Sequence, residues 1–225
     1  MKQFHVESRD NKLIGNAGLI HVGRFAKKLG LKNILERHLS ISSGENAKYD
    51  VTTCILMLVI GVIGGVRHLS HLLLLKADTV IRKLFGWESF PHPSTFGRLF
   101  KLFRQVHCHE LSEAENEVRR KVWSKKWFGL VTLDLDSSVQ GVYGFQEGAS
   151  KGYNPHKKGQ RSYHPLFCFM VQTGECLYTW FRAGDAYSGN GAEDFIKECY
   201  SRLPKRVVTL LLEVCPNASN LALFY

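Results

Sequence analysis

The sequence predicts a mixed α+β or α/β protein, in which a helical region (residues 1–128) precedes a mixed β-sheet region (residues 129–225). Apolar residues recur at helical spacing through the first region and alternate at strand spacing from residue 129 onwards. A helix-like segment then separates a hairpin pattern from a last apolar strand, as is typical of a mixed sheet. With 44% hydrophobic residues among 225, the chain can bury a substantial core.

The helical region opens with apolar side chains on one helical face, followed by Gly30 as a natural helix stop. A short helix is expected over 33–39, and Asp50 is placed to cap the helix after it. The residues of the first apolar face are Leu19, Val22, Phe25, Ala26 and Leu29.

Residues 52–66 form an apolar run that ends at Arg67 and is shorter than the roughly 20 residues needed to span a bilayer core. We therefore expect a buried helix here and no membrane partner. Residues 1–5 lack the apolar core of a signal peptide. The cysteines show neither framework spacing nor a Cys-x-x-Cys pair, which favours a reduced, cytoplasmic protein.

Residues 78–106 have the outline of a helix-turn-helix: a helix over 78–85, a turn, and a second helix capped by Ser94. Basic residues spaced by three are expected on the exposed face of the second helix, where they can contact DNA. An ordinary amphipathic helix with a solvated basic face explains the same pattern. The expected DNA contacts are Arg98, Lys101 and Arg104; the expected buried side carries Phe96, Leu99, Phe100, Phe103 and Val106.

A further helix over 110–126 leads into the sheet region, where the spacing becomes that of strands. A Thr173–Gly174 turn is expected to join two of these strands. The strands are expected over 129–136, 139–145, 164–172 and 175–181, with a helix over 192–203 and a buried apolar strand over 207–212.

Two aspartates, Asp134 and Asp136, end the first strand and project to the same face because they are two residues apart. A carboxylate in an apolar strand is costly unless it is paired or binds a metal ion. Carboxylates can hold Mg²⁺ for phosphodiester chemistry. Alternatively, one aspartate caps the following turn through Ser137 or Ser138. We assign the cap to Asp134 and the catalytic and metal-binding role to Asp136.

The net charge of +10 favours an anionic partner, with DNA or RNA as the first candidate. A basic, glycine-rich loop over 151–164 also contains Tyr153 and Tyr163, which can stack on unpaired bases. A solvated surface loop is the alternative interpretation. The basic residues expected to contact DNA phosphates are Lys151, Lys157, Lys158 and Arg161.

Six motifs resemble bacterial insertion-sequence transposases of the DDE type, over roughly residues 13–204 and most densely over 131–193. They are LDLDSS (133–138), YGFQEGA (143–149), GYNPHKKG (152–159), SYHPL (162–166), RAGDA (182–186) and SGNGA (188–192).

The resemblance implies an RNase H-like catalytic domain that cleaves transposon ends and joins their 3′ hydroxyls to target DNA. It also implies Mg²⁺, with Mn²⁺ as an alternative, held by two aspartates and a glutamate, of which Asp136 matches the first. The implied partners are transposon-end and target DNA, together with a second copy or an intact transposase. The implied location is the bacterial cytoplasm, at the nucleoid.

The sequence departs from the family pattern over 206–225. The family's second aspartate is missing there, no Asp follows Asp194, and we interpret Glu213 as a coincidental acid near the expected position. We therefore expect an incomplete RNase H-like domain, truncated or frameshifted before the second catalytic Asp. Such a chain alone should be inactive and should not bind Mg²⁺ stably. The alternatives are a non-catalytic protein that binds transposon ends, and an unrelated metal-dependent nuclease that would need further acidic ligands.

Overall fold

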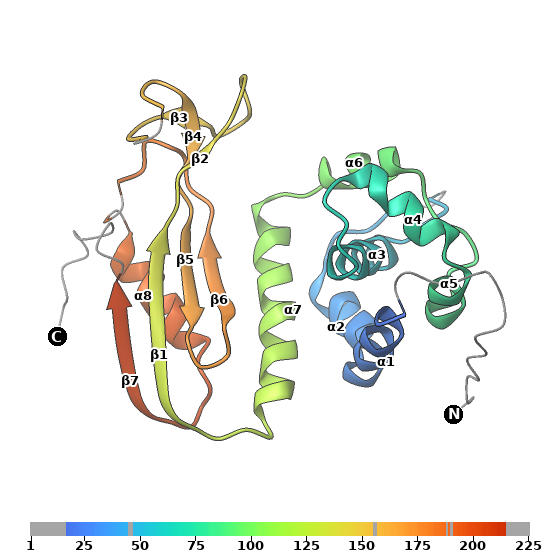
Figure 1. The fold of residues 1–225 in the computed structure, drawn as a ribbon, viewed down its shortest axis with the longest axis horizontal. Coiled ribbons are helices and arrows are strands. Elements are labelled where there is room, and N and C mark those ends of the chain that lie inside the picture. The colour runs from blue at the N-terminus through green and yellow to red at the C-terminus, as the bar shows by residue number, and fades with distance from the viewer. Residues whose placement is uncertain (1–16, 45–46, 155–156, 188, 190, 215–225) are drawn as a thin grey trace. The chain divides into compact units, whose positions relative to one another are not determined.

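The computed structural model describes residues 17–44, 47–154, 157–187, 189 and 191–214. They belong to two compact units, one reaching Lys121 and the other beginning at Val122 (Figure 1). The expected boundary, 128/129, lies a few residues further along the chain. The tail beyond Val214 and parts of two motifs (155–156, 188 and 190) lie outside the described residues.

The first unit is helical throughout its described part, and its last helix, α7, continues across the boundary between the units. Its elements are α1 (Leu19–Leu29), α2 (Leu31–His38), α3 (Val51–Ile63), the 3₁₀ turn η1 (Leu69–His71), α4 (Leu72–Ala77), α5 (Thr79–Phe85), α6 (Pro93–Phe100) and α7 (Gln105–Trp123).

Local signals explain where several of these helices begin and end. Gly30 ends α1 in the left-handed conformation, with φ at 70°. The Asp50 carboxylate accepts a hydrogen bond from the Thr53 N–H at 2.7 Å and so caps α3. Asp78 caps α5 in the same way through the N–H groups of Val80 and Ile81. The Gly30 stop and the Asp50 cap confirm what the sequence predicts.

Most of the apolar helix α3 lies in the core of the helical unit, as expected, but Val62 and Ile63 at its end are 65% and 53% exposed. Met57 and Ile60 are fully buried within a cluster that includes Leu72 and Phe96. Gly61 allows α4 to approach closely, because a Cβ at this position would overlap the Leu72 side chain. In the described part of the chain, no helix combines the length and the apolar composition needed to cross a bilayer.

The second unit contains a four-stranded mixed sheet in the order β6-β5-β1-β7, confirming the predicted class (Figure 1). β1 pairs antiparallel with β5 and parallel with β7, while β5 and β6 form a hairpin. The helix α8 packs on one face, where Phe195 and Cys199 join the sheet core. The elements are β1 (Phe128–Ser137), β5 (Leu166–Met170), β6 (Glu175–Trp180), α8 (Ala192–Ser201) and β7 (Val207–Val214).

Two strand predictions are wrong. The expected strand over 139–145 is reduced to β2 (Gln140–Gly141), because β5 takes the place beside β1 and Gly144 turns the chain with φ at 92°. β2 instead belongs to a small sheet of order β2-β4-β3, with β3 (Ser150–Lys151) and β4 (Arg161–Tyr163). The expected buried strand is β7, which lies at the edge of the described sheet with Val208 73% exposed.

Candidate nucleic-acid interface

Asp136 lies near the carboxyl end of β1, on the face opposite α8. Val131, Leu133 and Leu135 alternate with the aspartates and are buried against α8, so Asp136 projects from the other face. Its Oδ1 accepts a hydrogen bond from the Ser137 N–H at 2.8 Å. This bond joins neighbouring residues within the strand and does not cap the following turn, so the cap that we assign to Asp134 from the sequence stays a prediction.

Two further acidic residues, Asp134 on β1 and Glu213 on β7, belong to the same sheet as Asp136. Asp134 is in register with Glu213 on β7, so both belong to the face that also carries Asp136. From the sequence we interpret Glu213 as a coincidental acid, because its alignment with Asp134 becomes visible only in the parallel pairing of β1 with β7. Among the described residues, however, no three His, Cys, Asp or Glu side chains are close enough to hold a metal ion.

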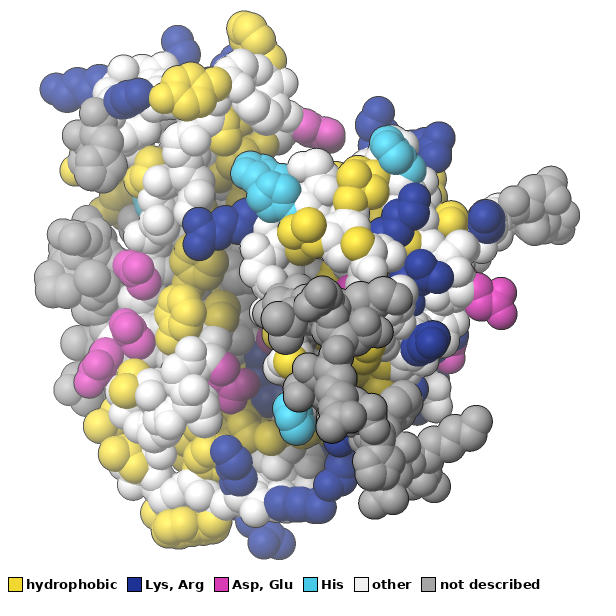
Figure 2. Space-filling model, turned by 45° about the vertical axis from the view of Figure 1, so that its right-hand side comes forward, with side chains coloured by type: hydrophobic (Ala, Val, Ile, Leu, Met, Phe, Trp, Pro, Cys, Tyr) yellow, Lys and Arg dark blue, Asp and Glu magenta, His cyan; other side chains and the backbone are white. Residues whose placement is uncertain are grey.

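The small sheet follows β1 directly and carries most of the basic residues predicted to contact DNA. Ser150 pairs with Ser162, and Lys151 pairs with Arg161. Lys151, Lys157 and Lys158 are exposed, and Arg161 is half-buried. Figure 2 shows Lys and Arg side chains beside exposed hydrophobic side chains at the top left of the molecule, over this sheet.

The segment 182–186 packs closely against the small sheet. The Arg182 guanidinium donates from Nε to the carbonyl of His164 at 3.0 Å, and the His164 N–H donates to the carbonyl of Arg182 at 2.9 Å. A Cβ at Gly184 would overlap the backbone oxygens of Ser150 and Ser162. Only glycine fits between these backbones, which explains its place in the RAGDA motif.

Aromatic and basic side chains pair on the small sheet. Lys157 donates a hydrogen bond from Nζ to the Tyr143 hydroxyl at 2.9 Å. This bond lowers the pKa of Tyr143 and raises the pKa of Lys157. The Arg161 guanidinium lies 5.0 Å from the centre of the Phe145 ring and donates to the Ala149 carbonyl at 2.8 Å.

A hollow of about 370 Å³ opens between these groups. Phe145 is 90% exposed and Tyr143 is 76% exposed at its wall. The lining contains no acidic side chain and consists of Val142, Tyr143, Gly144, Phe145, Lys151, Gln160 and Arg161.

The two tyrosines expected to stack on bases differ in their environments. Tyr153 is 77% exposed. The Tyr163 ring instead packs on Phe181 with centroids 4.5 Å apart, and its hydroxyl donates to the Glu147 carbonyl at 2.6 Å. Sequence reasoning missed Tyr143 and Phe145, although both lie in the YGFQEGA motif. Two aromatic residues flanking a glycine beside a basic loop could have indicated them.

The local structure over 78–106 differs from the helix-turn-helix that the sequence predicts. α6 is capped by the His92 side chain, whose Nδ1 accepts from the Ser94 N–H at 3.3 Å, and Ser94 is not the cap. The connection between α5 and α6 covers 86–92, longer than the roughly three or four residues of a helix-turn-helix turn.

The three basic residues expected on one helix are exposed but do not share an element. α6 ends at Phe100, so Arg98 lies on α6, Lys101 at its C-cap, and Arg104 just before α7. Phe96 and Leu99 are buried as expected. The prediction is wrong for Phe100 and Val106, which are 50% and 53% exposed. Phe100 is the last residue of α6, and Val106 belongs to α7 because the chain leaves the path of α6 after residue 100.

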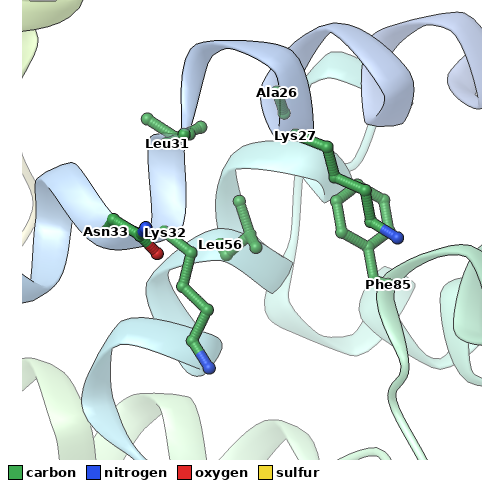
Figure 3. A pocket seen from close by; sticks show the side chains of 8 residues that line it. Ala26, Lys27, Leu31, Lys32, Asn33, Leu56 and Phe85 are labelled. Carbon is green, nitrogen blue, oxygen red and sulfur yellow. The ribbon is translucent and has the colours of Figure 1, made fainter.

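A smaller hollow of about 200 Å³ lies within the helical unit, between α1, α2, α3 and α5 (Figure 3). Its wall is mainly apolar, with Ala26, Leu56 and Phe85, and carries the lysines Lys27 and Lys32. Lys32 also forms an ion pair with Glu36 at 3.5 Å. Sequence reasoning gave no sign of this hollow.

Comparison with known families agrees with this arrangement of a mixed sheet and a basic excursion after its first strand. The model of the family described as "Transposase DDE domain group 1" matches residues 1–211, so the chain belongs to this family of DDE transposases. The family carries out DNA transposition, and its members act on DNA with a divalent metal ion. No curated protein and no solved structure matches the chain.

Proposed function

We propose that the 225-residue polypeptide binds transposon-end and target DNA but does not by itself cleave or join DNA strands. The observation that carries this proposal is the acidic set of the β1 face. Asp136 lies where a catalytic aspartate could hold a metal ion, but the described residues bring no three acids together around it.

The electrostatic requirement explains why a single aspartate is insufficient. Two Mg²⁺ ions require carboxylates that bridge and neutralise them, and Mg²⁺ demands a nearly ideal octahedron of oxygen ligands. Asp136 would supply one such ligand, and among the described residues no group of three acids surrounds it. We therefore expect neither Mg²⁺ nor Mn²⁺ to be held stably by this polypeptide.

DNA affinity is expected to come mainly from the small sheet. Its exposed cations can neutralise phosphates without reading sequence, which gives binding that weakens as salt rises. Additional contacts are proposed for Arg98, Lys101 and Arg104, which are exposed around the end of α6. These contacts would place the protein at the nucleoid of the bacterial cytoplasm.

The test is a cleavage and binding assay on labelled transposon-end DNA with Mg²⁺ or Mn²⁺. We expect a salt-dependent mobility shift and no cut strand. Nicking by the purified polypeptide that Asp136→Ala abolishes would contradict the proposal, because it would show a working metal site.

A second candidate is a non-catalytic protein that occupies transposon ends and competes with an intact transposase. The helical unit favours it, since this unit has its own buried core and exposed basic residues. Adding the polypeptide to an intact transposase acting on the same ends should then inhibit cleavage. Size-exclusion chromatography of the two proteins without DNA would distinguish competition for the transposon ends from formation of a mixed oligomer.

A further inference from the structure

We propose that the hollow beside Tyr143 and Phe145 receives one unpaired base of single-stranded or locally opened DNA. This inference deepens the proposed DNA-binding function and rests on it. The base would stack on the Phe145 ring, and the neighbouring phosphates would meet Lys151 and Arg161.

The Phe145 ring offers a surface on which a base can stack. A phenylalanine side chain that remains 90% exposed contributes little to a folded core, so its position needs another explanation. Arg161 lies 5.0 Å from the ring centre, and Ala149 accepts a hydrogen bond from Arg161 and so helps to hold the guanidinium there. Because the side chain is nevertheless almost fully exposed, the rest of the ring is open to a stacking partner.

The size and polarity of the hollow suit one nucleotide. Its volume of about 370 Å³ falls within the roughly 300–1,000 Å³ of small-molecule sites, which suits a single nucleotide better than a duplex. Gln160, which lines it, carries an amide that can both donate and accept hydrogen bonds at a base edge. The amide now donates to the Val142 carbonyl at 3.3 Å, a long bond that a ligand can replace.

The charge of the residues around the hollow favours a nucleic acid. Lys151 and Arg161 line the hollow, and the lining contains no acidic side chain. Lys157 is hydrogen-bonded to Tyr143 at its wall. Aromatic rings interleaved with cations are the pattern by which proteins hold unpaired nucleotides, since every base has a stacking face. A paired base cannot reach such a ring without leaving its stack, so the occupant is an unpaired base.

The experiment compares the complete polypeptide and its variants on two probes, a short fully paired DNA duplex and the same duplex with a one-base bulge. Wild type should bind the bulged duplex more tightly. Stacking is worth about 1–3 kcal/mol per base, so Phe145→Ala should weaken binding to the bulged probe by about 5- to 150-fold. Binding to the paired duplex should change little.

Three further variants separate stacking from charge and from folding. Phe145→Trp should retain the preference for the bulge. Tyr200→Ala removes another exposed aromatic side chain of the same unit, 65% exposed on α8, and should change neither affinity. Lys158→Ala should weaken both probes by a similar factor. Melting curves for each variant establish that the fold is retained.

Equal loss on both probes in Phe145→Ala, or no preference of wild type for the bulge, would overturn this inference while leaving DNA binding intact. Failure of wild type to bind either probe would overturn both the inference and the proposed function. Binding of vesicles containing anionic lipids that Phe145→Ala abolishes, with DNA binding unchanged, would show a membrane surface as the occupant instead.

Discussion

Glu117 on α7 interacts with three basic side chains of the helical unit. Its carboxylate accepts hydrogen bonds from Arg37 at 2.6 Å and from the His38 ring at 2.9 Å, and Lys121 lies 3.2 Å away. The bond from Arg37, followed by that from His38, lowers the pKa of Glu117 from 4.5 to about 2. This single side chain links α2 to α7.

The first prediction concerns the pH dependence of this link. Because the folded-state pKa is depressed, the stabilisation is present above pH 4.5 and is lost as the pH falls towards 2. Glu117→Gln should lower the free energy of unfolding by about 1 kcal/mol at neutral pH, and the difference from wild type should shrink between pH 4.5 and 2. Urea unfolding followed by circular dichroism measures both. Glu36→Gln, in an exposed pair with Lys32, is the control and should have a smaller effect.

Gly184 is the residue on which the attachment of segment 182–186 to the small sheet depends. Gly184→Ala places a methyl group against the backbone oxygens of Ser150 and Ser162, which cannot move as a side chain can. We expect a loss of about 1–3 kcal/mol in the free energy of unfolding, measured by urea titration, and weaker DNA binding. Gly97→Ala meets nothing within 4 Å in α6 and should be neutral or stabilising. A stable Gly184→Ala protein would contradict the prediction.

At the scale of elements, β7 is an edge strand of the described sheet and pairs with β1 on one side. Val208, Leu210 and Leu211 are exposed at 73%, 36% and 47%. An apolar edge strand with free backbone groups favours pairing with other chains, so this strand is expected to promote aggregation.

A charge placed on β7 should reduce that aggregation. Val208→Lys should lower light scattering at high protein concentration without lowering the melting temperature, because the side chain already faces solvent. Phe25→Lys, on α1, adds the same charge at a side chain that is 54% exposed but far from any strand in the sequence, and should not reduce scattering. Equal improvement in both variants would show that net charge, rather than the strand edge, controls solubility.

At the scale of the whole molecule, the net charge of +10 is distributed over exposed groups in both units. Binding to DNA should therefore be dominated by counterion release, with the logarithm of the affinity falling linearly with the logarithm of salt concentration. The small sheet concentrates four of the basic residues within residues 151–161. This concentration makes the salt dependence sensitive to single substitutions there.

Lys158→Ala should reduce the slope of that salt dependence by about 1, because one phosphate contact is lost. Lys205→Ala removes the same charge from an exposed position just before β7 and should leave the slope unchanged. Fluorescence anisotropy at several salt concentrations measures the slope. If the two variants behave alike, the DNA contacts are spread over the whole protein rather than concentrated on the small sheet.

Short-range patterns predict a large part of this protein. The helical spacing, the Gly30 stop and the Asp50 cap specify their helices, since each depends on neighbours within a few residues. The alternation in β1 also predicts that Asp134 and Asp136 project to the same face. The motifs around it indicate the transposase family, and the family match confirms that interpretation.

Long-range pairing decides the rest. No local pattern predicts that β5, rather than residues 139–145, pairs with β1. Nor does one predict that Glu213 on β7 is in register with Asp134 on β1. The contact between Arg161 and Phe145 likewise depends on strand pairing in the small sheet, which joins residues that are not neighbours in sequence. Such contacts are selected by the packing of the complete unit, because one pattern of alternating residues is compatible with several strand partners.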